Sequence, residues 1–174
     1  IKKLNLKIKK KTSFEGSGEF QIGEKKDDFK YIIELDKQDL KFDLELNVRK
    51  IPFKIDLINF TRSDDEVISL NVKGKKKKDN FLFNEIILKK NNDKFYFNDL
   101  ILSRNFQIKS LNEIDLKYTD TNKIKNDISI VRKNKNNFLI KSNNFNLSKI
   151  IDQILLNDTS NTKLFDNKER IFKI

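Results

Sequence analysis

An eight-residue pattern that occurs twice is the feature that most constrains this chain. Residues 81–88 (FLFNEIIL) and residues 95–102 (FYFNDLIL) share the form Phe-x-Phe-Asn-acid-aliphatic-Ile-Leu, at an offset of 95 − 81 = 14 residues. Residues 89–94 between them (KKNNDK) are polar. Two similar apolar segments joined by a short polar turn predict neighbouring antiparallel strands of one meander.

Each copy of the pattern also contains a change of phase. In the first copy, Phe81 and Phe83 occupy odd positions, whereas Ile86 and Leu88 occupy even ones. Strict alternation would place the two pairs on opposite faces of the sheet. One extra residue at 84–85, and another at 98–99, would return each pair to the same face, as a β-bulge does. We therefore predict paired bulges in a curved sheet; the alternative is that each copy changes faces and both faces are partly covered.

Alternation of apolar and polar residues extends over most of the chain. The clearest example is residues 40–48 (LKFDLELNV), and charged, Asn-rich turns separate the alternating segments. A further strand is expected at residues 53–57, directly after Pro52. Short connections of this kind favour hairpins over crossover helices. The fold class expected is mainly β, with a curved antiparallel meander over residues 1–142, either an open groove or sandwich-like.

Only one segment has a helical period, and it follows the meander. Residues 147–155 place apolar side chains at helical spacing along one stripe, and Asn146 is a suitable N-cap. We expect a short amphipathic helix over residues 143–157, then a polar loop and the start of another strand over residues 158–174. The whole is expected to be a single domain, cut from a longer protein. One short helix cannot cover the sheet, so a sandwich, a closed barrel and an open groove remain alternatives.

The residue inventory argues against catalysis. The chain contains neither His nor Cys, which removes the usual nucleophile–base pairs and most transition-metal sites. The acidic groups at Asp27, Asp28 and 64–66 lie in expected turns, where acids are ordinary. The sequence from Gly16 to Gly18 lacks the lysine and the following helix of a phosphate-binding loop. We predict a protein that is not an enzyme, with no catalytic residue, cofactor or metal.

The charge of the chain is strongly basic, with 37 Lys and Arg against 26 Asp and Glu, a net +11. Because these charges alternate with apolar residues along the strands, a solvated sheet face explains them better than a nucleic-acid site, so no specific nucleic-acid partner is expected. The run of lysines at 75–78 lies in an expected turn and is the one charge cluster that suits anionic lipid or nucleic acid. No apolar run approaches the roughly 18 residues of a membrane-spanning helix.

The last third of the chain resembles a known family. An expected strand pair, at residues 128–131 and 138–142, runs into the sequence NNFNLSKII at residues 143–151. This resembles the strand-then-helix step of AsmA-like bacterial envelope proteins, the YhdP-type and TamB-type bridge-like lipid transporters. In that comparison Phe145 matches the family phenylalanine, Asn146 its capping aspartate, and Ile150 and Ile151 its paired aliphatic residues.

The resemblance implies a long periplasmic β-groove, anchored to the inner membrane by a segment that is not in this chain. Its partners would be phospholipid and the inner and outer membranes, and its role lipid transport in outer-membrane and envelope biogenesis. An uncovered apolar face suits acyl chains, since each buried methylene gains about 0.8 kcal/mol. The candidate groove-lining residues are Phe42, Leu44, Leu46, Phe53, Ile55, Leu57, Phe81, Phe83, Phe95 and Phe97. The alternative is that they form the ordinary core of a structural or interaction β-domain without ligand.

Overall fold

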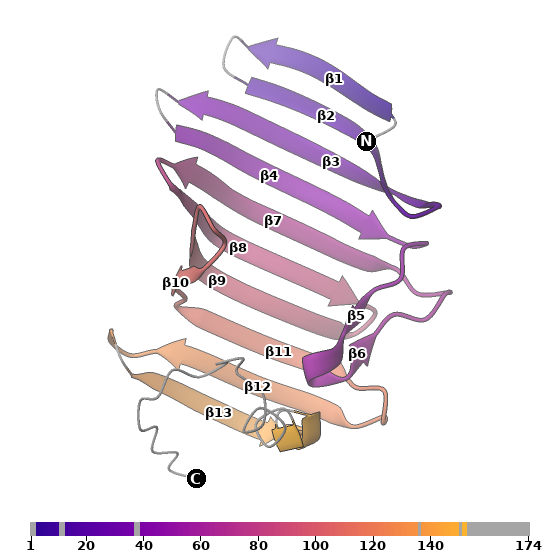
Figure 1. Cartoon of the computed structure of the whole chain (residues 1–174), viewed down its shortest axis with the longest axis vertical. Coiled ribbons are helices and arrows are strands. Elements are labelled where there is room, and N and C mark those ends of the chain that lie inside the picture. Colours follow the sequence, from indigo (N-terminus) through magenta and orange to yellow (C-terminus); the bar gives the residue numbers. More distant parts are fainter. Residues whose placement is uncertain (1–2, 11–12, 37–38, 136, 150, 153–174) are drawn as a thin grey trace.

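The computed structural model describes residues 3–10, 13–36, 39–135, 137–149 and 151–152. This part of the chain is mainly β (Figure 1). Its elements are β1 (Lys3–Lys10), β2 (Ser13–Ile22), β3 (Lys25–Asp36), β4 (Asp39–Val48), β5 (Lys54–Ile55), the 3-10 helix η1 (Asp56–Ile58), β6 (Phe60–Thr61), β7 (Ile68–Lys77), β8 (Asn80–Lys90), β9 (Asp93–Ser103), β10 (Ile108–Ser110), β11 (Glu113–Thr119), β12 (Lys125–Arg132) and β13 (Phe138–Asn144).

Eleven of the strands form one antiparallel sheet. Ten follow the order β1-β2-β3-β4-β7-β8-β9-β11-β12-β13, and β10 pairs with β9. Every strand of this order lies beside the next along the chain, with two exceptions: a segment containing β5, η1 and β6 separates β4 from β7, and β10 separates β9 from β11. The expected antiparallel meander is therefore confirmed. Of the arrangements left open by the sequence, the large open sheet is the one that forms, with β1 and β13 at its two ends (Figure 1).

The paired bulge is present where the change of phase predicts it. On β7, Lys73 pairs with Glu85 and the next residue, Gly74, pairs with Phe83, so Asn84 is the extra residue of β8. Its counterpart on β9 is Asp99, which lies between the paired residues of β8 and β9 and has a left-handed φ of 49°. Both strands gain one residue at the same place, so they stay in register with each other. The extra residue also returns the apolar side chains in the second half of each copy to the face that the first half occupies.

Gly74 is the residue that lets the bulged strand lie close to β7. A Cβ added at this position would meet the backbone oxygen of Leu82 and would lie 2.9 Å from the Phe42 ring and 3.1 Å from Cα of Phe83. A close backbone approach of this kind is a standard reason for glycine inside a strand. The ring of Phe42 occupies the space above the glycine and meets Phe83 edge to face, at 5.8 Å between centroids.

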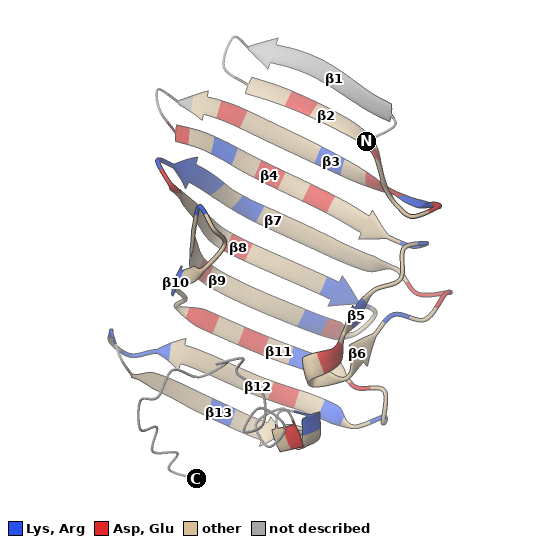
Figure 2. Cartoon of the chain, viewed as in Figure 1, with Lys and Arg blue, Asp and Glu red and all other residues tan. Residues whose placement is uncertain are grey.

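The bulge and the register together place the apolar residues of successive strands on one face of the sheet, which we call the apolar face. Across β4, β7, β8 and β9 the register aligns Leu44 with Val72, Val72 with Ile86, and Ile86 with Phe97. The same face continues through Ile114 of β11. The residues between them, on the other face, are mostly charged, as the colouring along the strands shows (Figure 2). This confirms the period-two reading of the strands.

Residues 49–67, which we call the insertion, fold back over one end of the apolar face. The strand expected at residues 53–57 is wrong: β5 covers only Lys54–Ile55, pairs with β6 in a separate two-stranded sheet, and gives way to η1. Phe60 of the insertion is fully buried and joins a cluster with residues of the main sheet. The members of this buried cluster are Val48, Ile51, Phe60, Ile68, Leu88, Phe95 and Tyr118.

The described residues contain only the beginning of the expected C-terminal helix. Residues 148–149 and 151–152 are helical, and the Ile151 N–H donates to the Leu147 carbonyl at 2.9 Å. Asn146 acts as the predicted cap, because its side-chain oxygen accepts from the Ser148 N–H at 3.1 Å. No α-helix of seven residues is formed within the described ranges. Ile150 and residues 153–174, with the expected loop and further strand, lie outside them.

Candidate functional site

The apolar face is the candidate site, and seven of the ten predicted lining residues belong to it. Phe42, Leu44 and Leu46 lie on β4, Phe81 and Phe83 on β8, and Phe95 and Phe97 on β9. All of these except Phe95 are half-buried. Phe95 is only 1% exposed and belongs to the buried cluster, so it supports the fold rather than an accessible surface.

The other three predicted residues lie on the insertion and not in the main sheet. Phe53 and Ile55 pack against the buried cluster from the insertion side. Leu57 lies in η1 and is 40% exposed. These residues therefore help to form or flank the cover over one end of the apolar face, while the uncovered part is lined by the strands of the sheet.

Several residues of the apolar face were not among the candidates. Their signal was the same alternation, but their strands are less regular in sequence than residues 40–48. They are half-buried and include Tyr31, Ile33, Leu70, Ile86, Leu100, Ile114, Leu116 and Ile130. The face consequently extends from β3 to β12, further than the candidate set indicated.

An aromatic group fills the covered end of the face. The Phe60 ring lies 4.6 Å from that of Phe95 and 6.0 Å from that of Tyr118, and both pairs are edge to face. Phe53 adds a further edge-to-face contact with Phe60 at 6.3 Å. Burial, and then the charge of Asp120, raises the pKa of Tyr118 to about 12. This end of the face is therefore a packed core that offers no room to a ligand.

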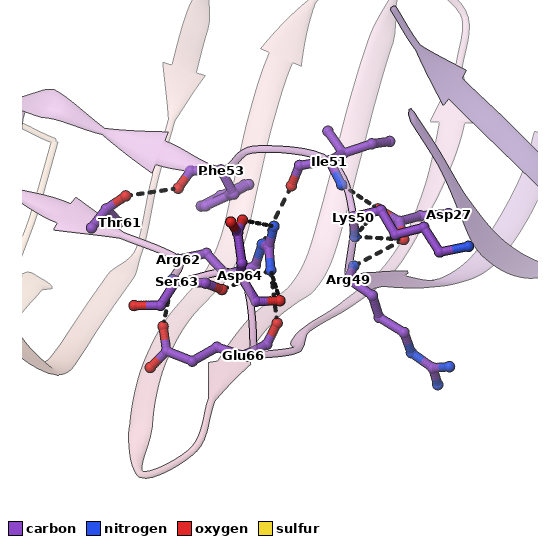
Figure 3. Close-up of polar contacts among 10 residues, drawn as sticks. All are labelled: Asp27, Arg49, Lys50, Ile51, Phe53, Thr61, Arg62, Ser63, Asp64 and Glu66. Carbon is purple, nitrogen blue, oxygen red and sulfur yellow. Dashed lines mark hydrogen bonds and ion pairs between the residues drawn. The ribbon is translucent and has the colours of Figure 1, made fainter. Parts of the chain in front are cut away.

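The start of the insertion is fixed by Asp27, which is 4% exposed. Its carboxylate accepts hydrogen bonds from the backbone N–H groups of Arg49, Lys50 and Ile51, at 2.9–3.1 Å (Figure 3). A carboxylate that accepts several backbone N–H groups holds a turn firmly, since the bonds are charge-assisted. The sequence suggested only an ordinary turn residue at Asp27, and the structure shows that it anchors the insertion to β3.

The middle of the insertion is organised around Arg62, whose side chain is 1% exposed. Its guanidinium donates to the carbonyl groups of Ile51, Ser63 and Glu66, at 2.7–3.3 Å. Asp64, whose side chain is 100% exposed, lies at 3.7 Å (Figure 3). The five-donor fork of arginine suits this role, because it reaches several carbonyl groups at once.

Lys90 ties the insertion to the hairpin of β8 and β9. Its ammonium donates to the Thr61 carbonyl at 3.2 Å, lies 3.3 Å from both Glu66 and Asp93, and lies 4.7 Å from the centre of the Phe60 ring. Burial acts to raise the pKa of Glu66, but the backbone N–H of Ser63 and the charge of Lys90 outweigh it and lower that pKa. These contacts hold the insertion on the sheet at the β8–β9 hairpin.

Asp120 links the turn after β11 to the start of the C-terminal helix. It accepts from the backbone N–H groups of Asn122 and Ile124, both at 2.9 Å, and from the Asn146 side chain at 2.7 Å. Burial acts to raise the pKa of Asp120, but the bonds from Asn146, Ile124 and Asn122 favour the charged form and lower the pKa from its ordinary 3.8. Of the family-motif residues, Asn146 therefore joins this network, and Phe145 packs against the buried cluster.

We expect Asp120→Asn to lower the free energy of unfolding at neutral pH by about 1.5 kcal/mol, because an amide replaces a charged acceptor and faces the Asn146 amide with its own NH₂. A carboxyl whose pKa is lower in the folded state stabilises the fold above its unfolded pKa, and this contribution is lost as the pH falls through the folded pKa. The gap between wild type and variant should therefore close on acidification. Urea unfolding at neutral and acidic pH measures it, and a gap that stays constant would contradict the assignment.

The chemical repertoire of the described residues is narrow. No group of three or more His, Cys, Asp or Glu side chains is placed to hold a metal ion there. A shallow hollow of about 460 Å³ lies on the charged side of β2–β4, between side chains such as Glu15, Lys30 and Glu45. None of the helical segments that the structure describes is long and apolar enough to cross a membrane.

Comparisons with protein families, with curated proteins and with solved structures find no match to this chain. The resemblance to AsmA-like proteins therefore stays a resemblance of residues 143–151 and of the general plan of the meander. The apolar face is the feature of the described residues that bears on function.

Proposed function

We propose that this chain is a stretch of an AsmA-like periplasmic β-groove, whose apolar face carries phospholipid acyl chains between the inner and outer membranes during envelope biogenesis. The parent protein would be anchored to the inner membrane by a segment outside this chain. One observation carries the proposal: a continuous apolar face spans the sheet, and most of its residues away from the insertion are only half-buried.

The chemistry of this face suits acyl chains. Phe42, Leu44 and Phe83 offer apolar surface without a polar group among them, and each methylene that they remove from water contributes about 0.8 kcal/mol. Apolar surface left open over several strands is unusual on a soluble protein and marks a binding surface. The polar head group of a phospholipid would stay in water at the rim of the sheet.

The sheet topology also suits a longer groove. β1 and β13 stand at the two ends of the strand order, and the described residues pair each of them on one side only. On β13, Phe138 and Ile140 are 49% and 52% exposed. An edge of this kind can pair with a further strand, which is how a groove would continue beyond this piece.

Native mass spectrometry with lipid extraction, on the chain purified from bacterial periplasm without harsh detergent, tests the proposal. We expect co-purifying phospholipid in the wild type and at least about tenfold less in Phe42→Asp/Phe83→Asp, because each carboxylate makes the apolar surface costly to cover with an acyl chain. Phe95 is unsuitable for this purpose, since its burial means that a charge there would unfold the protein.

The matched control is Ile32→Asp, on the charged face of β3 and 43% exposed in the wild type. Circular dichroism and urea unfolding verify that both variants fold. Lipid lost from the double variant alone supports a lipid-carrying face. A folded wild type without lipid would overturn the proposal and favour a structural or interaction β-domain that needs no ligand.

A further inference from the structure

We propose that one corner of the sheet docks onto the surface of an anionic phospholipid bilayer. It combines the end of β7 and the turn that follows, which carry the lysines at 75–78, with the loop after β9 and the start of β10, which carry Arg104, Phe106, Ile108 and Lys109. The turn expected at residues 75–78 is wrong for three of these lysines, because Lys75, Lys76 and Lys77 extend β7 and only Lys78 of the four lies in the turn. We call these residues the basic corner. The basic corner meets the face proposed to carry lipid at Phe81, on which Phe106 stacks, and each proposal can hold without the other.

Two contacts join the turn and the loop into one surface. The Phe106 ring stacks on the Phe81 ring at 5.6 Å between centroids, with an interplanar angle of 8°. The Lys109 ammonium donates to the Asn80 side-chain oxygen at 2.7 Å. Figure 2 shows the cationic end of β7 and the loop at β10 on the same side of the molecule, opposite β5 and β6. Segments about 30 residues apart in sequence therefore present one patch.

Positive charge outnumbers negative charge in this patch. The lysines at 75–78, with Arg104 and Lys109, stand beside two carboxylates, that of Asp79 in the turn and that of Asp39, which precedes the Lys76 partner Leu40 on β4. None of these four lysines forms a side-chain hydrogen bond or an ion pair with another residue that the structure describes. Clustered cations repel one another, and an external anionic surface relieves that repulsion.

Apolar side chains stand beside these cations. Phe106 and Ile108 are 69% and 68% exposed, the two highest exposures among the exposed large apolar residues of the described chain. Phe106 also has a left-handed φ of 58°, which is rare for a bulky residue. Two hydrogen bonds within residues 103–107 hold Phe106 in this conformation. The Phe106 N–H donates to the Ser103 carbonyl at 2.9 Å, and the Gln107 N–H donates to the Ser103 hydroxyl at 3.1 Å.

A bilayer is the partner that uses both halves of the corner. Lysines meet the anionic head groups, while an aromatic ring and an aliphatic side chain enter the boundary between head groups and acyl chains. A nucleic acid would use the lysines but would gain nothing from Ile108. The corner also lies at the end of the apolar face that the insertion leaves uncovered, so docking would bring that open end to the lipid surface (Figure 1).

Sedimentation of the 174-residue chain with lipid vesicles tests the proposal. We expect binding to phosphatidylcholine vesicles that contain phosphatidylglycerol, little binding to pure phosphatidylcholine, and loss of binding as salt is raised. Each lysine near an anionic surface contributes about fivefold to partitioning. Lys76→Gln/Lys77→Gln/Lys78→Gln should therefore weaken binding by about 100-fold.

The matched control, Lys25→Gln/Lys50→Gln/Lys125→Gln, removes the same charge from exposed lysines outside the corner. It should weaken binding far less. An equal loss in the control would overturn the proposal, because net charge and not the corner would then explain the binding. Absence of binding to the anionic vesicles at low salt would overturn it as well.

Phe106→Asn tests the apolar half independently. Asparagine tolerates a left-handed φ, so the variant should fold at least as stably as the wild type. We expect its vesicle binding to fall about tenfold, because the ring no longer enters the bilayer boundary. Unchanged vesicle binding, or duplex DNA that displaces the vesicles, would overturn the bilayer as partner. A chain that binds anionic vesicles but co-purifies without lipid would support the corner and overturn the lipid-carrying face.

Discussion

Replacing Phe60 by alanine should lower the free energy of unfolding by about 3–5 kcal/mol, the cost of removing a fully buried aromatic ring. Phe60 is 0% exposed and touches Phe53, Phe95 and Tyr118 edge to face. It also receives the ammonium of Lys90 at 4.7 Å from its ring centre. The loss therefore removes the centre of the contact between the insertion and the sheet. Urea unfolding, followed by circular dichroism, measures the effect.

Phe138→Ala is the matched control, since it removes the same side chain from an edge strand where the wild-type residue is 49% exposed. We expect it to cost about 1 kcal/mol or less, because little of its surface leaves water on folding. If the two variants were equally stable, the insertion would not form part of the core, and the apolar face would be open along its full width.

Replacing Arg62 by methionine should cost about 3–5 kcal/mol, because each buried carbonyl group left without its donor costs about 1–3 kcal/mol. Methionine has a similar length but cannot donate, so the carbonyl groups of Ile51, Ser63 and Glu66 lose their shared donor. The effect should be local. Limited proteolysis should cut the variant within residues 49–67, and hydrogen exchange should show those amides opening before the amides of the sheet strands.

Asp64→Asn separates the hydrogen bonds of Arg62 from its ion pair. The Asp64 side chain is 100% exposed and lies 3.7 Å from the guanidinium, a geometry that contributes little in water. We expect this variant to unfold within about 0.5 kcal/mol of the wild type. Equal destabilisation by the two substitutions would mean that the ion pair, and not the shared carbonyl groups, holds the insertion.

The strands and the bulge could be predicted because both depend on the local period of apolar residues in the sequence. A period of two specifies which residues share a face, and the change of phase between Phe83 and Ile86 requires one extra residue if that face is to stay buried or bound. The register of β7 and β8 places that residue at Asn84. Neither conclusion depends on a distant part of the chain.

The insertion could not be predicted, because its structure depends on contacts far away in sequence. Residues 53–57 alternate as a strand would, yet three apolar residues at a period of two fit a hairpin packed on a sheet equally well. Arg62 and Asp27 looked like turn residues, since nothing in their own neighbourhoods shows that they become buried. Their partners are brought together only when the insertion folds over the sheet.

The topology gives the molecule an uneven cooperativity. Each strand of the meander touches only its neighbours, as in a repeat array, so opening at one edge need not spread to the other. Phe60 adds a contact between strands that are not consecutive. The insertion connects β4 to β7, yet its Phe60 ring packs against Phe95 of β9 and Tyr118 of β11. We therefore expect the middle of the sheet to unfold as a unit, while its two outer edges open and re-form as hairpins without unfolding the centre.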